Sequence, residues 1–230
     1  MKDRGIRHGD RRRQRDAMVQ QQIIQRGVQT PEVIAALRKV PREKFIARAL
    51  DEFAYDDAPL PIAEQQTISQ PYIVAFMLDA LQLTGHERVL EIGTGSGYAA
   101  ALLAELAAEV VTLERYKSLA DEARTVLQTL GYNTVEVIQS DGTLGWPERA
   151  PYGGIVVAAA APEVPQALKE QLAIGGRLVI PVGTLDGQSL RCVTRVSEHD
   201  YQDEHLTQVR FVPLVGEAGW AGLDNTPPGH

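Results

Sequence analysis

The sequence predicts an α/β protein with a central, mostly parallel sheet and helices on both of its faces. Between residues 88 and 181, short apolar segments alternate with segments of helical periodicity, which is the order of βαβ units. In addition, the glycine-rich residues 93–97 lie between the first apolar segment and the helical one after it. An open parallel sheet binds its ligands at such a position.

The composition indicates a single domain with a core of its own. The chain has 230 residues, of which 44% are hydrophobic. Its longest purely apolar run, residues 155–161, is too short to span a bilayer, and residues 1–16 lack the apolar core of a signal peptide. Cys192 is the only cysteine, so an internal disulfide is excluded. We expect its thiol to be packed in the interior, and we expect the protein to be cytoplasmic and to have no membrane partner.

Charge is unevenly distributed along the chain. The net charge is −7, yet residues 1–16 carry seven basic and three acidic side chains. We predict that residues 1–15 form a disordered, solvated tail, because they lack interleaved aromatic side chains and precede an acidic body. The same acidic body argues against nucleic acid as a partner.

The N-terminal third is predicted to be helical around one ordered loop. A first helix over residues 16–26 ends at Gly27, and a second begins after a Thr30 cap, with Pro31 at its first position and Pro41 after its end. Residues 53–66 show neither helical nor strand periodicity and predict an ordered loop. Residues 71–83 again have the apolar spacing of a helix.

The remaining elements follow from periodicity and from turn residues. Strands are predicted over residues 88–92, 110–113, 135–138, 155–159 and 177–181, and helices over residues 98–106, 119–130 and 164–172. Two hairpin strands, 189–196 and 207–215, follow. We therefore expect one domain over residues 16–217, comprising a helical part (16–83), a core (84–183) and C-terminal strands (184–217), with an irregular tail at 218–230.

The glycine loop, Gly93-Thr94-Gly95-Ser96-Gly97, is the strongest local signal for a ligand site. Glycines permit positive φ and let the backbone approach a ligand that a side chain would block. The loop does not identify the ligand by itself, because Gly95, Gly97 and Ala100 also match the spacing of dinucleotide-binding loops.

Three acidic residues lie at the ends of three successive predicted strands. Glu91, two residues before Gly93, suits the positively charged end of S-adenosyl-L-methionine better than a pyrophosphate. Glu114 can accept both hydroxyls of a ribose, and Asp141, followed by Gly142, can bind an adenine amino group. The carboxyl ends of parallel strands meet at one edge of the sheet, so these residues predict an adenosine cofactor there.

Other short segments occur in a characteristic order: residues 40–45 (VPREKF), 60–62 (LPI), 66–71 (QTISQP), 150–152 (APY), 160–165 (AAPEVP), 175–178 (GGRL), 181–183 (PVG) and 211–214 (FVPL). In these segments the chain resembles the protein-L-isoaspartate O-methyltransferase family from about residue 16 to 217. The resemblance implies a class I, Rossmann-like methyltransferase fold with an N-terminal helical extension. It also implies methyl transfer from S-adenosyl-L-methionine to the free α-carboxylate of L-isoaspartyl residues in damaged proteins, with D-aspartyl residues as a further possible acceptor.

The resemblance also assigns residues. Ser69 matches the family's active-site serine. The predicted cofactor-binding residues are Thr67, Ile68, Gln70, Glu91, Gly93, Thr94, Gly95, Ser96, Gly97, Glu114, Asp141 and Gly142. No metal ligands are predicted, because the histidines lack ligand spacing.

Several alternatives remain open from the sequence. Ser69 also precedes a helical segment and could act only as its N-cap. Ala63-Glu64-Gln65 stands where the family usually has Gly-x-Gly, which leaves the path of that loop open. The rival functions are another S-adenosylmethionine-dependent methyltransferase that acts on small molecules or nucleic acid, an NAD(P)-linked oxidoreductase, and a non-catalytic binding protein.

Overall fold

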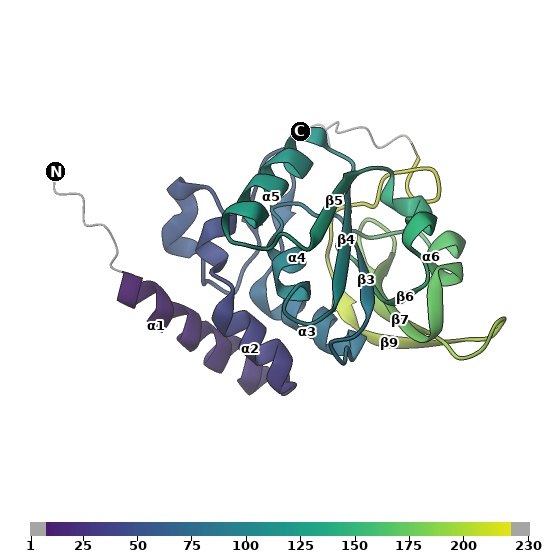
Figure 1. Cartoon of the computed structure of the whole chain (residues 1–230), viewed down its shortest axis with the longest axis horizontal. Coiled ribbons are helices and arrows are strands. Elements are labelled where there is room, and N and C mark those ends of the chain that lie inside the picture. The colour runs from purple at the N-terminus through teal and green to yellow at the C-terminus, as the bar shows by residue number, and fades with distance from the viewer. Residues whose placement is uncertain (1–7, 222–230) are drawn as a thin grey trace.

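The computed structural model describes residues 8–221, which form a seven-stranded sheet with helices packed on it (Figure 1). The order of the strands in space is β5-β4-β3-β6-β7-β8-β9. These strands are β3 (Arg88–Ile92), β4 (Glu109–Glu114), β5 (Val135–Gln139), β6 (Tyr152–Val157), β7 (Leu172–Gly183), β8 (Gln188–Arg195) and β9 (Tyr201–Val209). A separate antiparallel pair joins β1 (Leu60–Pro61) and β2 (Thr67–Ile68).

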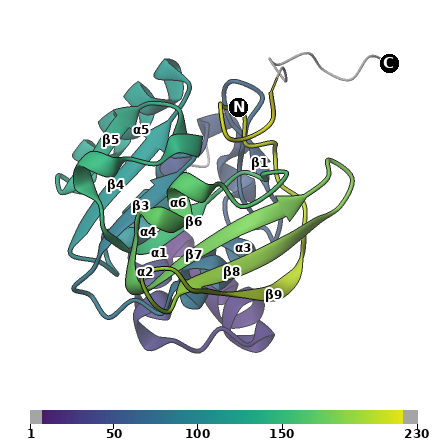
Figure 2. The same cartoon turned by 90° about the vertical axis from the view of Figure 1, so that its right-hand side faces the viewer.

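The sheet is mostly parallel, which confirms the predicted fold class. The strands from β5 across to β7 run parallel, whereas β8 is antiparallel to β7 and to β9. Figure 2 shows β8 and β9 beside β7 at one end of the sheet. The strand order reverses between β3 and β6, so a crevice is expected at their carboxyl ends.

Helices cover both faces of the sheet. They are α1 (His8–Met18), η1 (Val19–Ile23), η2 (Ile24–Arg26), α2 (Pro31–Lys39), η3 (Arg42–Phe45), η4 (Arg48–Phe53), α3 (Pro71–Leu81), α4 (Tyr98–Leu103), α5 (Lys117–Thr129), η5 (Gly142–Leu144), η6 (Pro147–Arg149) and α6 (Gln166–Glu170). None of these helices is both long and apolar enough for a membrane span within residues 8–221.

Alternation along the strands divides the buried side chains into two apolar clusters. Val89 and Val156 belong to the cluster that also holds residues of α1 to α5. Leu90 and Ile155, one position away on the same strands, belong to the cluster that holds Leu168 of α6. Figure 1 shows α4 and α6 on opposite sides of the sheet. The first face carries most of the helices, and the second is covered by α6 together with loops.

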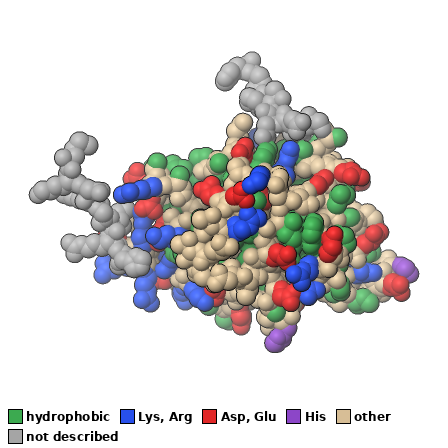
Figure 3. Space-filling view, turned by 45° about the horizontal axis from the view of Figure 1, so that its top comes forward, with side chains coloured by type: hydrophobic (Ala, Val, Ile, Leu, Met, Phe, Trp, Pro, Cys, Tyr) green, Lys and Arg blue, Asp and Glu red, His purple; other side chains and the backbone are tan. Residues whose placement is uncertain are grey.

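The N-terminal helix begins earlier than predicted. Residues 8–15 belong to α1, so the expectation of a disordered tail is wrong for them; residues 1–7 lie outside the described residues. Arg11 is buried and forms an ion pair with Asp51, which draws this turn of the helix onto the protein. Figure 3 shows Lys and Arg side chains gathered at the end of the molecule that carries α1.

Other local predictions were confirmed or corrected at single positions. The first helical segment ends at Gly27, whose φ is 99°, as predicted, and Pro31 opens α2. Thr30 does occupy the N-cap position, but its side chain makes no capping hydrogen bond. Cys192 is buried in β8, as expected of a packing thiol.

The last hairpin strand was placed too late in the sequence. β9 runs over Tyr201–Val209 rather than residues 207–215, because a tight turn follows Arg195. The Val196 N–H donates to the Asp200 carbonyl at 2.9 Å, which returns the chain at once. Since β9 is an edge strand with mostly polar, exposed side chains, its sequence carries little apolar periodicity.

Candidate active site at the carboxyl end of the sheet

Two adjoining cavities lie where the strand order reverses. The inner cavity and the second cavity share four lining residues: Thr67, Gly93, Gly95 and Ala158 line both. Thr67 comes from β2, the two glycines follow β3, and Ala158 follows β6. Segments far apart in the sequence therefore meet at this edge, as the strand order predicts for an open α/β sheet.

The glycine loop forms the floor of both cavities. The Gly93 N–H donates to the Leu113 carbonyl at 2.9 Å, which ties the loop to β4. Gly93 has φ 91°, a backbone conformation in which a residue with a side chain would be strained. The predicted residues Thr94 and Ser96 also line the inner cavity. Gly97, at the N-cap of α4, lines neither.

Glu91 is buried with one carboxylate oxygen unsatisfied. Its side chain lines the inner cavity and is 1% exposed. Oε2 accepts a hydrogen bond from Thr112 Oγ1 at 2.5 Å, whereas Oε1 has no partner among the described residues. Burial raises the pKa of Glu91 to about 8; the hydrogen bond from Thr112 opposes this shift, and the nearby Glu114 adds to it. A ligand with a cationic or hydrogen-bond-donating group would satisfy this oxygen.

Glu114 is arranged as an acceptor at the end of β4. Oε2 accepts from the Gly95 N–H at 2.9 Å, and Oε1 from the Tyr116 N–H at 3.0 Å. These two bonds fix the carboxylate against the glycine loop, on the wall of the second cavity. Each oxygen keeps a lone pair for a ligand, so the geometry suits the two hydroxyls of a ribose.

Asp141 has a structural role that the sequence did not reveal. Oδ1 accepts from the Thr143 N–H at 2.9 Å and from the Thr143 hydroxyl, and Oδ2 accepts from the Glu217 N–H at 2.8 Å. Burial alone would raise the pKa of Asp141, but these hydrogen bonds outweigh it and hold the pKa below its usual value. Asp141 lines a third, more open hollow, while its neighbour Gly142 lines the second cavity. Its predicted contact with adenine stays a prediction.

Ser69 lies where the inner cavity meets a wide outer groove, and it lines both. Its carbonyl accepts from Arg42 Nη2 at 2.8 Å, and its hydroxyl makes no hydrogen bond with another described residue. The N-cap of α3 is Gln70, without a side-chain capping bond, so the hypothesis that Ser69 caps this helix is wrong. The hydroxyl is therefore available to a ligand.

The other residues of this segment divide between the two sides of the site. Thr67 lines the inner cavity, the second cavity and the groove, and Ile68 lines the inner cavity. Gln70 lines only the groove, where its Nε2 donates to the Asp57 carbonyl at 3.1 Å. The structure therefore places Gln70 on the outer side, away from the cavities that the other predicted cofactor residues line.

Arg42 supports the segment from behind and was not predicted. Its guanidinium is fully buried, and it donates to the carbonyls of Ala54 and Ser69 at 2.9 and 2.8 Å. Burial lowers the pKa of Arg42, and the neighbouring Tyr98 and Tyr55 partly restore it. The sequence marked this arginine only as part of a family segment; its role depends on contacts with residues distant in the chain.

The segment after β9 closes the second cavity, and sequence reasoning missed this role too. Residues 212–215 line that cavity, and the Leu214 N–H donates to the Ala160 carbonyl at 2.8 Å.

Residues 8–221 contain no group of three His, Cys, Asp or Glu side chains placed to hold a metal ion. The glycine loop admits a methyl donor or a dinucleotide, and the unsatisfied acceptor oxygen of Glu91 favours the cationic methyl donor, so the fold and the site define a class I, Rossmann-like methyltransferase.

Comparisons with known proteins narrow this class. The family model for protein-L-isoaspartate(D-aspartate) O-methyltransferase matches residues 13–219. Over 215 residues the chain is 58% identical to the protein-L-isoaspartate O-methyltransferase 1 of Rhodopseudomonas palustris (strain HaA2), which covers 93% of this chain and 88% of that protein. It is also 58% identical over 207 residues to protein-L-isoaspartate O-methyltransferase 2 of Marinobacter nauticus; the match covers 90% of this chain and 94% of that protein.

Solved structures agree with the sequence comparisons. A protein-L-isoaspartate O-methyltransferase superposes with a TM-score of 0.81 at 27% identity, over 90% of this chain and 67% of that chain. A Plasmodium falciparum protein described as a putative member of the same family was solved with S-adenosyl-L-homocysteine. It superposes with a TM-score of 0.74 at 24% identity, over 86% of this chain and 96% of that chain. The chain belongs to the protein-L-isoaspartate(D-aspartate) O-methyltransferase family.

Proposed function

We propose that this protein transfers a methyl group from S-adenosyl-L-methionine to the free α-carboxylate of L-isoaspartyl residues in damaged proteins, and that D-aspartyl residues are a second acceptor. One observation carries the proposal besides family membership: Ser69, whose hydroxyl has no hydrogen-bond partner among the described residues, lines both the inner cavity and the wide outer groove. The two cavities suit a small cofactor, and the wide outer groove suits a segment of polypeptide.

The residues present fit the cofactor. The unsatisfied Oε1 of Glu91 faces a cavity where the cationic methionine end can lie, and Glu114 can accept the ribose hydroxyls. Gly93, whose φ of 91° would strain any other residue, leaves its part of the cavity wall without a side chain. When bound, S-adenosyl-L-methionine supplies an electrophilic methyl group on a sulfonium centre. An NAD pyrophosphate fits less well, because it offers no hydrogen-bond donor to the unsatisfied Oε1 of Glu91.

The reaction needs little proton transfer from the protein. An α-carboxyl group has an unperturbed pKa of about 3.5, so it is already an ionised nucleophile near neutral pH. A carboxylate oxygen forms a bond to the methyl carbon while the carbon–sulfur bond breaks and its electron pair stays on sulfur. The products are a methyl ester and S-adenosyl-L-homocysteine, and no proton moves.

The protein therefore acts mainly by holding the acceptor in place. The Ser69 hydroxyl can donate a hydrogen bond to the acceptor carboxylate, and Arg42 fixes the backbone of Ser69 through its carbonyl. Well-oriented placement of two reactants can contribute up to about 7–11 kcal/mol to lowering a barrier. The amide nitrogen of the following residue then attacks the ester carbonyl and expels methanol, which gives a succinimide. Hydrolysis of this ring returns a fraction of the damaged residues to a normal aspartyl linkage.

A pair of peptides tests this function. We expect purified protein to transfer methyl groups from S-adenosyl-L-methionine to an isoaspartyl peptide and to leave the same peptide with a normal aspartyl residue unmodified. Equal methylation of both peptides, or methylation of neither, would contradict the proposal.

We also propose a cytoplasmic location, consistent with a lone buried thiol; cell fractionation would test it.

A further inference from the structure

The outer groove beside Ser69 differs in charge from the rest of the molecule. The whole chain has 30 acidic and 23 basic side chains. By contrast, two arginines, Arg26 and Arg210, line the groove, and none of its lining residues is acidic. A positively charged groove on a negatively charged protein attracts anionic ligands.

The two arginines are not equivalent. The Arg26 guanidinium stacks 3.4 Å from the centre of the Tyr72 ring, and its Nη1 lies 2.9 Å from Asp57 Oδ2, which offsets much of its charge. Arg210 is exposed just after β9, and its side chain makes no ion pair or hydrogen bond with another described residue. Arg210 is therefore the positive charge of the groove that a substrate can pair with.

We propose that the groove favours isoaspartyl substrates with acidic side chains next to the damaged residue, and that Arg210 is the specificity-determining residue. This inference rests on the proposed function and adds the substrate class to it. Exposed ion pairs change an equilibrium by about two- to fivefold, so we expect a preference of that size, which weakens at high salt.

Three isoaspartyl peptides that differ only in one flanking residue, Glu, Gln or Lys, test the specificity. We expect kcat/KM to fall in that order for the native protein. Arg210→Gln should remove the order and Arg210→Glu should reverse it. Arg13→Glu is the matched control, because it makes the same change of net charge on α1, outside the groove.

The outcomes separate this inference from the proposed function. Equal kcat/KM values for the three peptides with the native protein would overturn the specificity and leave the repair activity in place. Equal changes in kcat/KM from Arg13→Glu and from Arg210→Glu would likewise overturn the specificity and leave the repair activity in place. Absence of methylation of every peptide would instead contradict the proposed function.

A second, independent feature is the β1–β2 hairpin, which carries the unusual Ala63-Glu64-Gln65 segment. The Gln66 N–H donates to the Ala63 carbonyl at 3.1 Å, and the two residues between them have φ values of 56° and 57°. Turns with two such residues normally use Asn and Gly. Strain of this kind persists only where surrounding contacts impose it.

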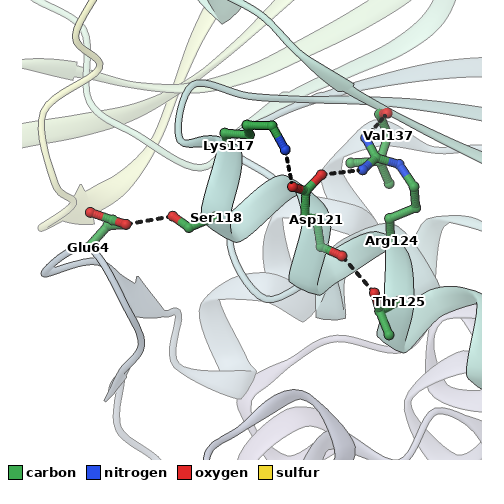
Figure 4. Close-up of polar contacts among 7 residues, drawn as sticks. All are labelled: Glu64, Lys117, Ser118, Asp121, Arg124, Thr125 and Val137. Atoms are coloured by element: carbon green, nitrogen blue, oxygen red, sulfur yellow. Dashed lines mark hydrogen bonds and ion pairs between the residues drawn. The ribbon is translucent and has the colours of Figure 1, made fainter.

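Such a contact lies at the tip of the hairpin. Glu64 Oε1 accepts a hydrogen bond from Ser118 Oγ at 2.5 Å, in the first turn of α5 (Figure 4). Gln66 and Thr67 form one wall of the second cavity, and Arg115 and Tyr116, just before α5, form part of another. The Glu64–Ser118 bond therefore joins two walls of the predicted cofactor cavity.

We infer that Glu64 and Ser118 are positioning residues that keep the hairpin closed over the cofactor. Losing one hydrogen bond changes an equilibrium by about two- to tenfold. We expect Ser118→Ala to raise the dissociation rate of S-adenosyl-L-homocysteine by that factor. Glu64→Ala should do the same, and Glu64→Gln, which keeps an acceptor oxygen, should restore most of the native rate.

The control removes a comparable hydroxyl from the same helix. Thr125 Oγ1 donates to the Asp121 carbonyl at 2.9 Å within α5, so Thr125→Ala should leave the dissociation rate unchanged (Figure 4). Equal dissociation rates for Ser118→Ala and Thr125→Ala would overturn the inference. Because the measurement is of binding, it does not depend on methyl transfer; native protein that fails to bind S-adenosyl-L-homocysteine would contradict the proposed cofactor instead.

Discussion

At the scale of single residues, Ser69 makes a clear prediction because its hydroxyl has no partner among the described residues. If the hydroxyl binds the acceptor carboxylate, Ser69→Ala should lower kcat/KM for an isoaspartyl peptide by about 10- to 100-fold, the effect of one hydrogen bond to a charged group. The melting temperature should change little, since the serine does not cap α3. Activity assays and thermal unfolding check both. A parallel loss of activity and stability would mean that the serine only supports the fold.

Glu91 predicts a dependence of stability on pH. Its folded pKa of about 8 lies above the ordinary carboxyl value of 4.5, so the unfolded chain releases this proton at lower pH than the folded protein does. The stability linked to Glu91 is therefore present below pH 4.5 and is lost as pH rises to about 8. Between pH 5 and 8.5 the loss is on the order of 4 kcal/mol without cofactor. Urea unfolding should show this loss in the native protein and not in Glu91→Gln; equal pH profiles would contradict it.

At the scale of elements, the β1–β2 turn predicts a stabilising substitution. Gln65 has φ 57° and has no side-chain hydrogen bond to another described residue, so Gln65→Gly removes strain without breaking the Glu64–Ser118 bond. A left-handed residue other than glycine costs about 1–2 kcal/mol, part of which glycine loses again through its greater freedom in the unfolded chain. We expect a net gain of about 0.5–1 kcal/mol in the free energy of unfolding. A loss of stability would show that the turn is not strained.

How far the elements were predictable depended on burial. The strand at residues 88–92 was predicted at its observed bounds because both of its faces are buried and its apolar residues run together. β9 was displaced because an edge strand with exposed polar side chains shows no such pattern. The start of α1 was missed because Arg11 is buried through an ion pair with Asp51, a partner distant in the sequence. The acids Glu91 and Glu114 were predictable because each lies at the end of a strand that the sequence shows. Arg42 was not, because its partners Ala54 and Ser69 are distant from it in the sequence.

At the scale of the whole molecule, the cofactor cavities join distant parts of the chain, so cofactor binding should stabilise the fold as a unit. β2, the glycine loop after β3, the end of β4 and residues 212–215 all line the second cavity. A ligand that binds only the folded state at 100 times its Kd adds about 2.7 kcal/mol of stability. For a domain of this size, that raises the melting temperature by about 5–10 °C.

Thermal unfolding with S-adenosyl-L-homocysteine checks this stabilisation by the cofactor. The same measurement with NAD at equal concentration distinguishes the two classes of ligand that a glycine loop can bind. We expect the shift with S-adenosyl-L-homocysteine alone, because the buried Oε1 of Glu91 lacks a hydrogen-bond donor and a pyrophosphate offers none. Replacing Glu91 with Gln puts an amide nitrogen in place of one acceptor oxygen, so the variant should lose part of the S-adenosyl-L-homocysteine shift. An equal shift with NAD in the native protein would mean that Glu91 does not select the ligand, and the dinucleotide-binding alternative would stand.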